Sequence, residues 1–314
     1  MDLEAATRWI DARLAALGVD REAPVELVRE RPWGSVARTK SSLGTLWLKA
    51  PGPATAFEVP LYELLSRVAP EATLEPIALD PERGWALLPD GGLSLGETQS
   101  GRALTDGLIN SVARYAALQR ALEPHVDTLL SLGIADFRPA VLIERLDDAF
   151  EAARRTAPEG VDGLIELQRR RPEIEAWVVE LEGRPGRPSL DHNDLHPWNV
   201  LGDPMDATTL RFYDWGDSVI QHPFAAAALP LGFVEREDPA ALDRAIDGYL
   251  EPFSELGTRA ELVETLELAG RTARIARTLT WARATASGEI EERFAHAPYE
   301  TLASTFDQSW TSST

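Results

Sequence analysis

The sequence predicts an α+β fold with two lobes, in which an antiparallel five-stranded sheet with one helix precedes a larger, mainly helical C-terminal lobe. Residues 25–88 break into short extended segments separated by turn residues. Long stretches with helical periodicity, rich in Ala, Leu, Glu and Arg, follow residue 90. Between them lies PDGG at residues 89–92, a strong turn signal. The expected lobes are therefore residues 1–89 and 90–314.

An additional amphipathic helix is expected before the sheet, over residues 2–18, because Asp2 is a good N-cap and Gly18 can end a helix. Five strands should follow, over residues 25–30, 36–39, 45–49, 74–79 and 85–88. A helix over residues 57–68 is predicted between the third and fourth strands, because its apolar residues recur with helical spacing.

The second lobe should contain helices over residues 97–122, 139–155, 160–182, 239–251, 259–286 and 298–310. Short apolar runs interrupt this helical pattern around residues 190–215 and are typical of strands. The polar residues between these runs are the chain's most informative feature, and they are expected on loops at strand ends.

Composition limits the partners and the compartment. The 314 residues carry a formal net charge of −20 with no basic stripe, which argues against nucleic acid. Most of the acidity follows residue 90, where it would attract a cationic small molecule, although acidic surfaces also simply favour solubility.

Cysteine is absent, the N-terminus lacks the apolar core of a signal peptide, and Pro230 breaks the longest apolar stretch. We therefore expect a soluble, cytoplasmic protein without a membrane segment. The sequence does not indicate an oligomeric state.

The run HNDLHPWN at residues 192–199, followed by FYDWGD at 212–217, supplies Asp194, Asn199 and Asp214. Phosphoryl transfer from ATP needs a carboxylate that accepts a proton from the attacking hydroxyl, and oxygen ligands that hold Mg²⁺ against the phosphates. A zinc site built on His192 and His196 is the rival interpretation. It is disfavoured because a proline directly follows the second histidine, and this opposes the helix that would pair the two.

Lysine usage gives an independent signal. All but two of the 31 basic residues are arginine, and the exceptions are Lys40 and Lys49. Lys40 lies in a turn and is expected in solvent. Lys49 ends an apolar strand and precedes a helix that carries Glu58 and Glu63, of which Glu63 is expected in solvent. A strand lysine held by a helix glutamate is the kinase pattern for gripping the α- and β-phosphates of the nucleotide.

Taken together, HNDLHPWN and YDWGD resemble the catalytic loop and metal-binding motif of the aminoglycoside phosphotransferase family, small-molecule kinases with the protein-kinase fold. The family usually has glycine where this chain has Asn193 and often where it has Trp198. The resemblance implies Asp194 as catalytic base and Asn199 with Asp214 as Mg²⁺ ligands. It also makes the N-terminal lobe the nucleotide-binding lobe.

The resemblance places Lys49 and Glu58 at the phosphates of ATP. His196 occupies a position that can face the γ-phosphate or only support the loop, and both interpretations stay open. The hairpin around Ser35 would cover the phosphates, although Gly34 is its only glycine and no GxGxxG is present.

The adenine contacts are predicted at the turn between the lobes and on the lysine strand. Pro89 has no N–H, so it can only accept through its carbonyl, and the donor to adenine should be the backbone N–H of Gly91. Trp47 lies two residues before Lys49, hence on the same face of the strand, where it would stack under the base. Packing of Trp47 in the core of the small lobe is the alternative.

The predicted function is ATP- and Mg²⁺-dependent transfer of the γ-phosphate to a hydroxyl of a small molecule. The acceptor class stays open among aminoglycoside-like compounds, amino sugars and related metabolites, because one sequence gives no signature for it. A nucleotide-binding pseudokinase with a regulatory role is the alternative. A protein kinase is disfavoured because no Ala-Pro-Glu motif follows Asp214.

Overall fold

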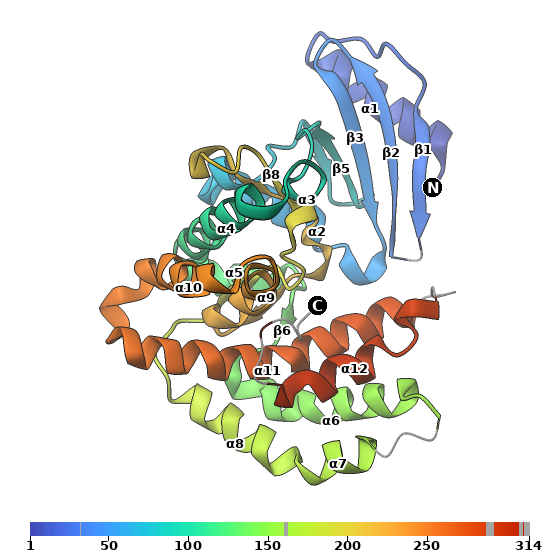
Figure 1. Ribbon diagram of the computed structural model, residues 1–314. Helices are drawn as coiled ribbons and strands as arrows, with labels where there is room; N and C mark the ends of the chain where they lie inside the picture. Colours follow the sequence, from blue (N-terminus) through green and yellow to red (C-terminus); the bar gives the residue numbers. More distant parts are fainter. Residues whose placement is uncertain (32, 160–162, 287–291, 308–309, 311–314) are drawn as a thin grey trace.

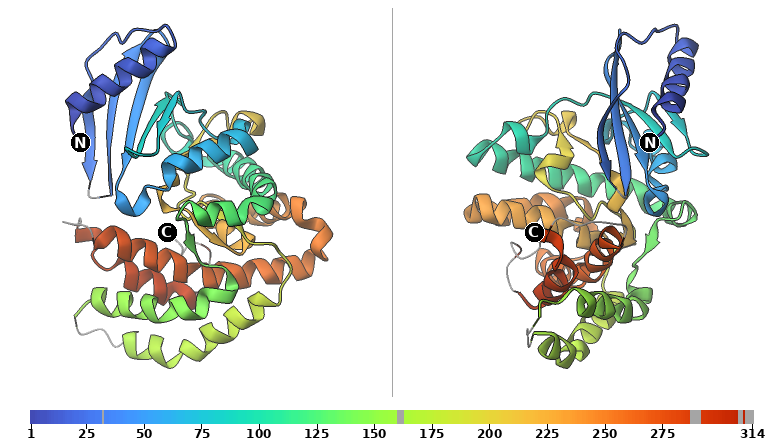
Figure 2. Two further views of the ribbon diagram at one scale, coloured as in Figure 1. Left: turned by 180° about the vertical axis from the view of Figure 1, so that it is seen from behind. Right: turned by 90° about the vertical axis from the view of Figure 1, so that its right-hand side faces the viewer.

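The computed structural model describes residues 1–31, 33–159, 163–286, 292–307 and 310. A twisted antiparallel sheet with one helix across it lies beside a larger body of helices (Figure 1). Figure 2 shows the same two parts from behind and from the side. The predicted α+β fold with a five-stranded antiparallel sheet is confirmed. The exact lobe boundary at residues 89 and 90 stays a prediction.

The large sheet has the strand order β1-β2-β3-β5-β4. Its strands are β1 (Glu26–Arg31), β2 (Gly34–Ser41), β3 (Gly44–Pro51), β4 (Ala78–Asp80) and β5 (Trp85–Pro89). All five match predicted strands, but β4 begins later than the predicted residue 74. In β3, Lys49 pairs with Val36 of β2 and Ala86 of β5, so the lysine lies on an interior strand of the sheet.

The helices next to the sheet are α1 (Leu3–Ala16) and α2 (Glu58–Val68). Asp2 caps α1 as predicted, since its side chain accepts the N–H of Ala5. The apolar side of α1 packs on one face of the sheet, against Leu46, Leu48 and Leu87. The apolar residues of α2 instead join the main core, which continues into the helical part of the chain.

The helical part contains α3 (Leu95–Thr98), α4 (Gly101–Leu122), α5 (Val126–Ser131), α6 (Pro139–Thr156), α7 (Gly163–Arg169), α8 (Arg171–Glu182), α9 (Ala228–Glu237), α10 (Leu242–Leu250), α11 (Arg259–Thr285) and α12 (Ala297–Ala303). Its short strands are β6 (Ala135–Asp136), β7 (Ser189–Asp191), β8 (Val200–Leu201), β9 (Arg211–Phe212) and β10 (Val219–Gln221). The sequence did not predict α5 and α9.

Two predicted long helices are each divided in the structure. The stretch 97–122 is interrupted before α4, where Ser100 has an extended conformation and serves as N-cap. The stretch 160–182 is interrupted before α8, because Pro172 is tolerated only in the first turn of a helix and therefore starts a new one. Residues 160–162 of the second stretch, and 308–309 of the last predicted helix, lie outside the described residues.

The short strands carry the polar motifs, as predicted. The loop from β7 to β8 contains Asp194, and the loop from β9 to β10 contains Asp214. Helix α11 runs past both loops, and α6, α8 and α12 pack with it around a second core. No helix among the described residues is both long and apolar enough to cross a membrane.

Candidate active site

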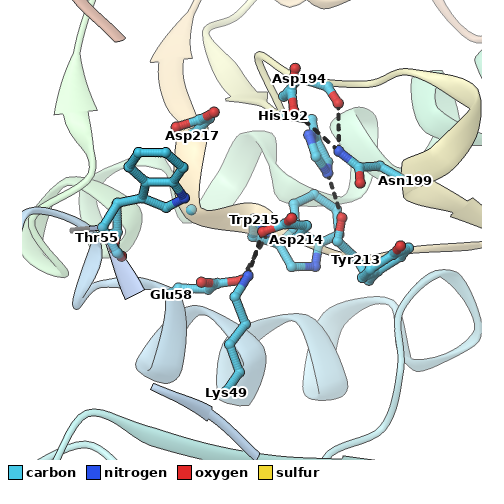
Figure 3. Close-up of polar contacts among 12 residues, drawn as sticks. Lys49, Thr55, Glu58, His192, Asp194, Asn199, Tyr213, Asp214, Trp215 and Asp217 are labelled. Atoms are coloured by element: carbon cyan, nitrogen blue, oxygen red, sulfur yellow. Dashed lines mark hydrogen bonds and ion pairs between the residues drawn. The ribbon is translucent and has the colours of Figure 1, made fainter. Parts of the chain in front are cut away.

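One lysine joins the sheet to the motif loops. The Nζ atom of Lys49 on β3 lies 2.5 Å from Oε1 of Glu58, the first residue of α2, and 2.5 Å from Oδ1 of Asp214 (Figure 3). Glu58 is 1% exposed, and its Oε1 also accepts the backbone N–H of Trp215 at 3.0 Å. The buried carboxylate therefore fixes both the lysine and the start of the loop that carries Asp214.

The charges in this trio influence one another. Burial would raise the pKa of Asp214, but the positive charge of Lys49 outweighs it and holds that pKa below the ordinary value. Burial raises the pKa of Glu58 to about 7, against the opposing effect of Lys49. Asp214 is therefore the carboxylate that stays ionised throughout the neutral range and remains available to a cation.

Two motif residues have left-handed backbone conformations that are unusual for residues other than glycine. Asp214 has φ 65° and Asn193 has φ 58°. Asparagine and aspartate tolerate this region best among residues with a side chain. Asn193, which stands where the family usually has glycine, therefore adopts a conformation that is also open to glycine. Its side chain adds a hydrogen bond to Oγ1 of Thr280 on α11, at 2.8 Å.

The second departure from the family pattern, Trp198, is also accommodated. Its indole packs on Gly96 of α3, where a Cβ atom would lie only 2.5 Å from the ring. The ring also contacts His196 and Phe233 edge-on and is 47% exposed. A glycine in a distant segment thus makes room for the bulky residue.

Asp194 lies among three polar side chains, those of Arg277, His196 and Asn199. Its carboxylate is 3.2 Å from Nη2 of Arg277 on α11 and 3.3 Å from Nε2 of His196. Burial would raise the pKa of Asp194, but the hydrogen bond with His196 and the charge of Arg277 lower it below the usual range for aspartate. Asp194 is therefore ionised and can accept a proton or a hydrogen bond.

Asn199 is oriented by the same loop. Its Nδ2 donates to the backbone carbonyl of Asp194 at 2.9 Å, and this leaves the Oδ1 atom without a hydrogen bond among the described residues. An amide oxygen and the carboxylate of Asp214 are hard ligands of the kind that Mg²⁺ prefers together with water and phosphate oxygens. The residues present therefore fit the magnesium site implied by the resemblance.

The histidines do not form a zinc site. His192 is buried, and its Nε2 lies 2.9 Å from the carbonyl oxygen of Tyr213, so it links the two motif loops. Within the described ranges, no three His, Cys, Asp or Glu residues are grouped closely enough to hold a metal ion. This geometry makes His192 a loop-positioning residue. His196 contacts both Asp194 and Asn199, so it supports the loop, and its contact with a phosphate stays a prediction.

The predicted adenine and phosphate contacts are only partly brought together. Trp47 shares the face of β3 with Lys49 and is half-buried, whereas Leu46 and Leu48 face α1 on the other side. The side chain of Ser35 points to the face of the sheet opposite Lys49, where its hydroxyl donates to Glu30 at 3.4 Å, and its contact with a phosphate stays a prediction.

The turn between the lobes is tightly packed. Pro89 ends β5 opposite Leu46, and the N–H of the next residue, Asp90, donates to the carbonyl of Thr45. A Cβ atom on Gly91 would lie 2.2 Å from a methyl group of Leu201, so a larger residue there would displace the leucine side chain. The hydrogen bonds that Pro89 and Gly91 would make with adenine stay predictions.

Sequence reasoning missed the arginines of α11. Arg277 contacts Asp194, and it also donates to the carbonyl of Asn193. Arg283 contacts Asp217 at 2.7 Å. The only signal was the spacing of Arg271, Arg274 and Arg277 along one helix. In a chain that uses arginine for nearly every positive charge, such a stripe is usually a solvated face.

Comparison with protein-family models identifies the family to which the chain belongs. Residues 36–262, more than half of the chain, match the model of the phosphotransferase enzyme family, abbreviated APH. A comparison with curated protein sequences found no match.

Solved structures with similar folds include three small-molecule kinases. Macrolide 2'-phosphotransferase from Brachybacterium faecium is 20% identical with a TM-score of 0.59, and the match covers 98% of each chain. Choline kinase from Cryptosporidium parvum is 14% identical with a TM-score of 0.64, covering 97% of this chain and 95% of that one. Choline kinase from Streptococcus pneumoniae is 13% identical with a TM-score of 0.60, covering 96% and 98%. At such identities the likeness establishes the protein-kinase-like fold.

Proposed function

The chain belongs to the phosphotransferase enzyme family of small-molecule kinases, and we propose that it transfers the γ-phosphate of ATP, with Mg²⁺, to a hydroxyl group of a small molecule. One observation carries the proposal. Lys49 of the sheet contacts Glu58 and Asp214 at once, so the group that would grip the phosphates is joined directly to a group that would hold the metal ion.

Asp194 acts on the acceptor in this proposal. Its ionised carboxylate accepts the proton of the attacking hydroxyl, while Arg277 and His196 hold it in place. Asn199 is fixed to the backbone of Asp194, so the proton acceptor and a metal ligand keep a constant separation. The proximity of these groups is the main contribution of the protein, because phosphoryl transfer depends on positioning and charge stabilisation.

Asn199 and Asp214 would hold Mg²⁺, which supplies positive charge against the phosphate oxygens. Lys49 would contact the α- and β-phosphates, and Glu58 would keep the ammonium group from turning away. Trp47 and the turn at Pro89 and Gly91 would bind adenine. Because all the charged groups of this set are present, regulation by a catalytically inactive pseudokinase is the weaker interpretation.

The test is ATP turnover with and without a panel of hydroxylated small molecules. We expect slow hydrolysis alone and faster ADP release with an accepted compound. Lys49→Ala should abolish this turnover, and Lys40→Ala is the matched control, because Lys40 is the only other lysine and is exposed on β2. Nucleotide binding without turnover under any of these conditions would favour the pseudokinase, and equal activity in both variants would remove Lys49 from the site.

A further inference from the structure

A cavity lies beside the catalytic loop, on the side of α11. Its volume is about 230 Å³, and it is bounded by the loop residues Asn193 and Leu195, by the start of α9, by α11 and by the segment that leads into α12. Arg277 lines this cavity and also contacts Asp194. The cavity is therefore placed to receive the acceptor if the proposed function holds.

Arg274 is the unusual residue of the cavity wall. Its side chain is 4% exposed and makes two hydrogen bonds, both to neutral groups. Nη1 donates to the carbonyl of Gly270 at 2.7 Å, and Nε donates to the hydroxyl of Ser304 at 3.0 Å. No carboxylate of the described residues lies within ion-pair distance of Arg274, whereas Arg277 and Arg283 each have an aspartate partner.

This guanidinium is buried and charged at the same time. Burial lowers the pKa of Arg274 to about 10, so the group keeps its proton at neutral pH. A buried charge without a counter-charge is costly, and such groups are normally paired. Two of the five N–H groups of Arg274 are used by its protein partners, which leaves three for another acceptor.

The acidic groups around the cavity do not supply the missing partner. Asp191 accepts the backbone N–H of Asn193 at 2.6 Å and a hydrogen bond from Gln221. Glu300 lies at the exposed rim. Asp307 attracts Arg274 only from beyond ion-pair distance.

We propose that this cavity binds an anionic group of the acceptor, a carboxylate or a phosphate, and that Arg274 is its main ligand. The planar guanidinium matches both groups, because it can donate two parallel hydrogen bonds. The proposal rests on the proposed function, and it names an acceptor whose charge is opposite to the one that the net charge of the whole chain would attract.

The geometry also limits the size of the acceptor. Arg274 and Arg277 are three residues apart on α11, a rise of about 4.5 Å along the helix. Because Arg277 touches Asp194, the anionic group and the reacting hydroxyl should be separated by only a few bonds. A cavity of about 230 Å³ lies below the range of roughly 300–1,000 Å³ typical of pockets for drug-sized ligands. A compact hydroxy acid or sugar phosphate fits better than a molecule with several rings.

Binding of simple anions tests the site without ATP or an identified acceptor. Sodium acetate and sodium succinate would replace sodium chloride at constant ionic strength while the melting temperature is measured. For binding in the millimolar range we expect succinate to raise the Tm by roughly 2–4 °C. The rise should disappear in Arg274→Gln and persist in Lys49→Ala, which excludes anions held at the phosphate grip.

Two further variants separate the charge of Arg274 from its structural hydrogen bonds. Arg271→Gln removes a charge one turn earlier on the same helix, outside the cavity wall. Ser304→Ala removes a structural partner of Arg274 without removing its charge. Both variants should keep the rise in Tm with succinate, and Arg274→Lys should keep part of that rise. An equal rise in Arg274→Gln, or no rise in the wild type, would overturn the proposal.

Acceptor kinetics give the second test. In a library sorted by charge, we expect turnover among the anionic compounds, with an acceptor KM that rises at least about tenfold in Arg274→Gln, since a charge-assisted hydrogen bond of ~1.5–3 kcal/mol is lost. The KM for ATP should not change. A productive neutral or cationic acceptor whose KM ignores the substitution would refute the anion site and leave the kinase function standing. Anion binding without any ATP turnover would support the anion site and refute the kinase function.

Discussion

In the proposed function, the nucleotide side and the acceptor side of the site are built from different kinds of sequence. On the nucleotide side, Lys49, Glu58 and Asp214 come from a strand, a helix start and a short motif, and the ammonium group of Lys49 contacts both carboxylates. On the acceptor side, Asp194 is held by Arg277, which comes from the middle of a 27-residue helix more than 80 residues later.

Under the proposed function, the difference separates the residues of the transfer chemistry from those that select the acceptor. A short motif can specify the transfer chemistry, because its residues are close in sequence and occupy fixed positions at strand ends. The cavity beside Asp194 depends on which side chains a long helix presents to the loop. Substitutions on α11 would therefore alter the choice of acceptor without altering Lys49 and Glu58, which would hold the phosphates.

Asp194→Asn should have the largest effect on the rate of transfer. It tests directly whether the acceptor side can be damaged without the nucleotide side. We expect phosphoryl transfer to fall by ~10²–10⁴-fold, the usual consequence of losing a general base. Binding of MgATP, measured by calorimetric titration, should survive because Asp194 does not belong to the phosphate grip. Unchanged turnover in the purified variant would remove Asp194 from its proposed role.

Asp214→Ala should damage the nucleotide side instead. The variant should bind ATP no more tightly with Mg²⁺ than without it, because the main carboxylate ligand is lost. Asn199→Ala should weaken metal use less, since it removes a neutral oxygen and retains the fold. Titration of ATP at several Mg²⁺ concentrations measures both effects. If either variant keeps the magnesium dependence of the wild type, the metal ion binds elsewhere.

Trp47→Ala tests whether the nucleotide side can be changed without affecting the acceptor side. If adenine stacks on the indole, the lost interaction is worth ~1–3 kcal/mol, and the KM for ATP should rise by ~5–150-fold. The KM for the acceptor should stay nearly constant, because Trp47 lies on the sheet and far from α11 in the chain. A folded variant with both KM values unchanged would show that Trp47 does not lie under the base.

The sequence predicted the arrangement of Trp47, Lys49 and Glu58 better than the contacts of α11, for a physical reason. Alternation along β3 correctly placed Trp47 and Lys49 on one face, and Glu58 rather than Glu63 was expected to hold the lysine, as it does. These are local signals. Ser35 was expected near the phosphates, but the same alternation turns its side chain to the other face, an outcome that depends on the exact pairing register.

The contacts of α11 could not be predicted in this way. Arg274, Arg277 and Arg283 have the same helical spacing as exposed arginines in many helices, and their roles depend on which loop packs against them. Burial of Arg274 without a carboxylate partner, and the contact of Arg277 with Asp194, appear only in three dimensions. Composition was equally uninformative, because 29 of the 31 basic residues are arginine.

Arg277→Gln should change the maximal rate only a little, but it tests most specifically whether α11 tunes the chemistry. Arg277 and His196 lower the pKa of Asp194, so in the wild type the base stays ionised across the neutral and mildly acidic range. Removing the guanidinium should raise that pKa by ~1–3 units, the usual effect of an opposite charge at this distance. Protonation would then inactivate the base, so the acidic limb of the kcat/KM profile should move to higher pH by the same amount. Arg277→Lys keeps the charge and should leave the limb close to its original position, and Arg271→Gln is the control for the helix. A merely structural role for Arg277 predicts a uniform loss at every pH, and that result would separate α11 from the chemistry of Asp194.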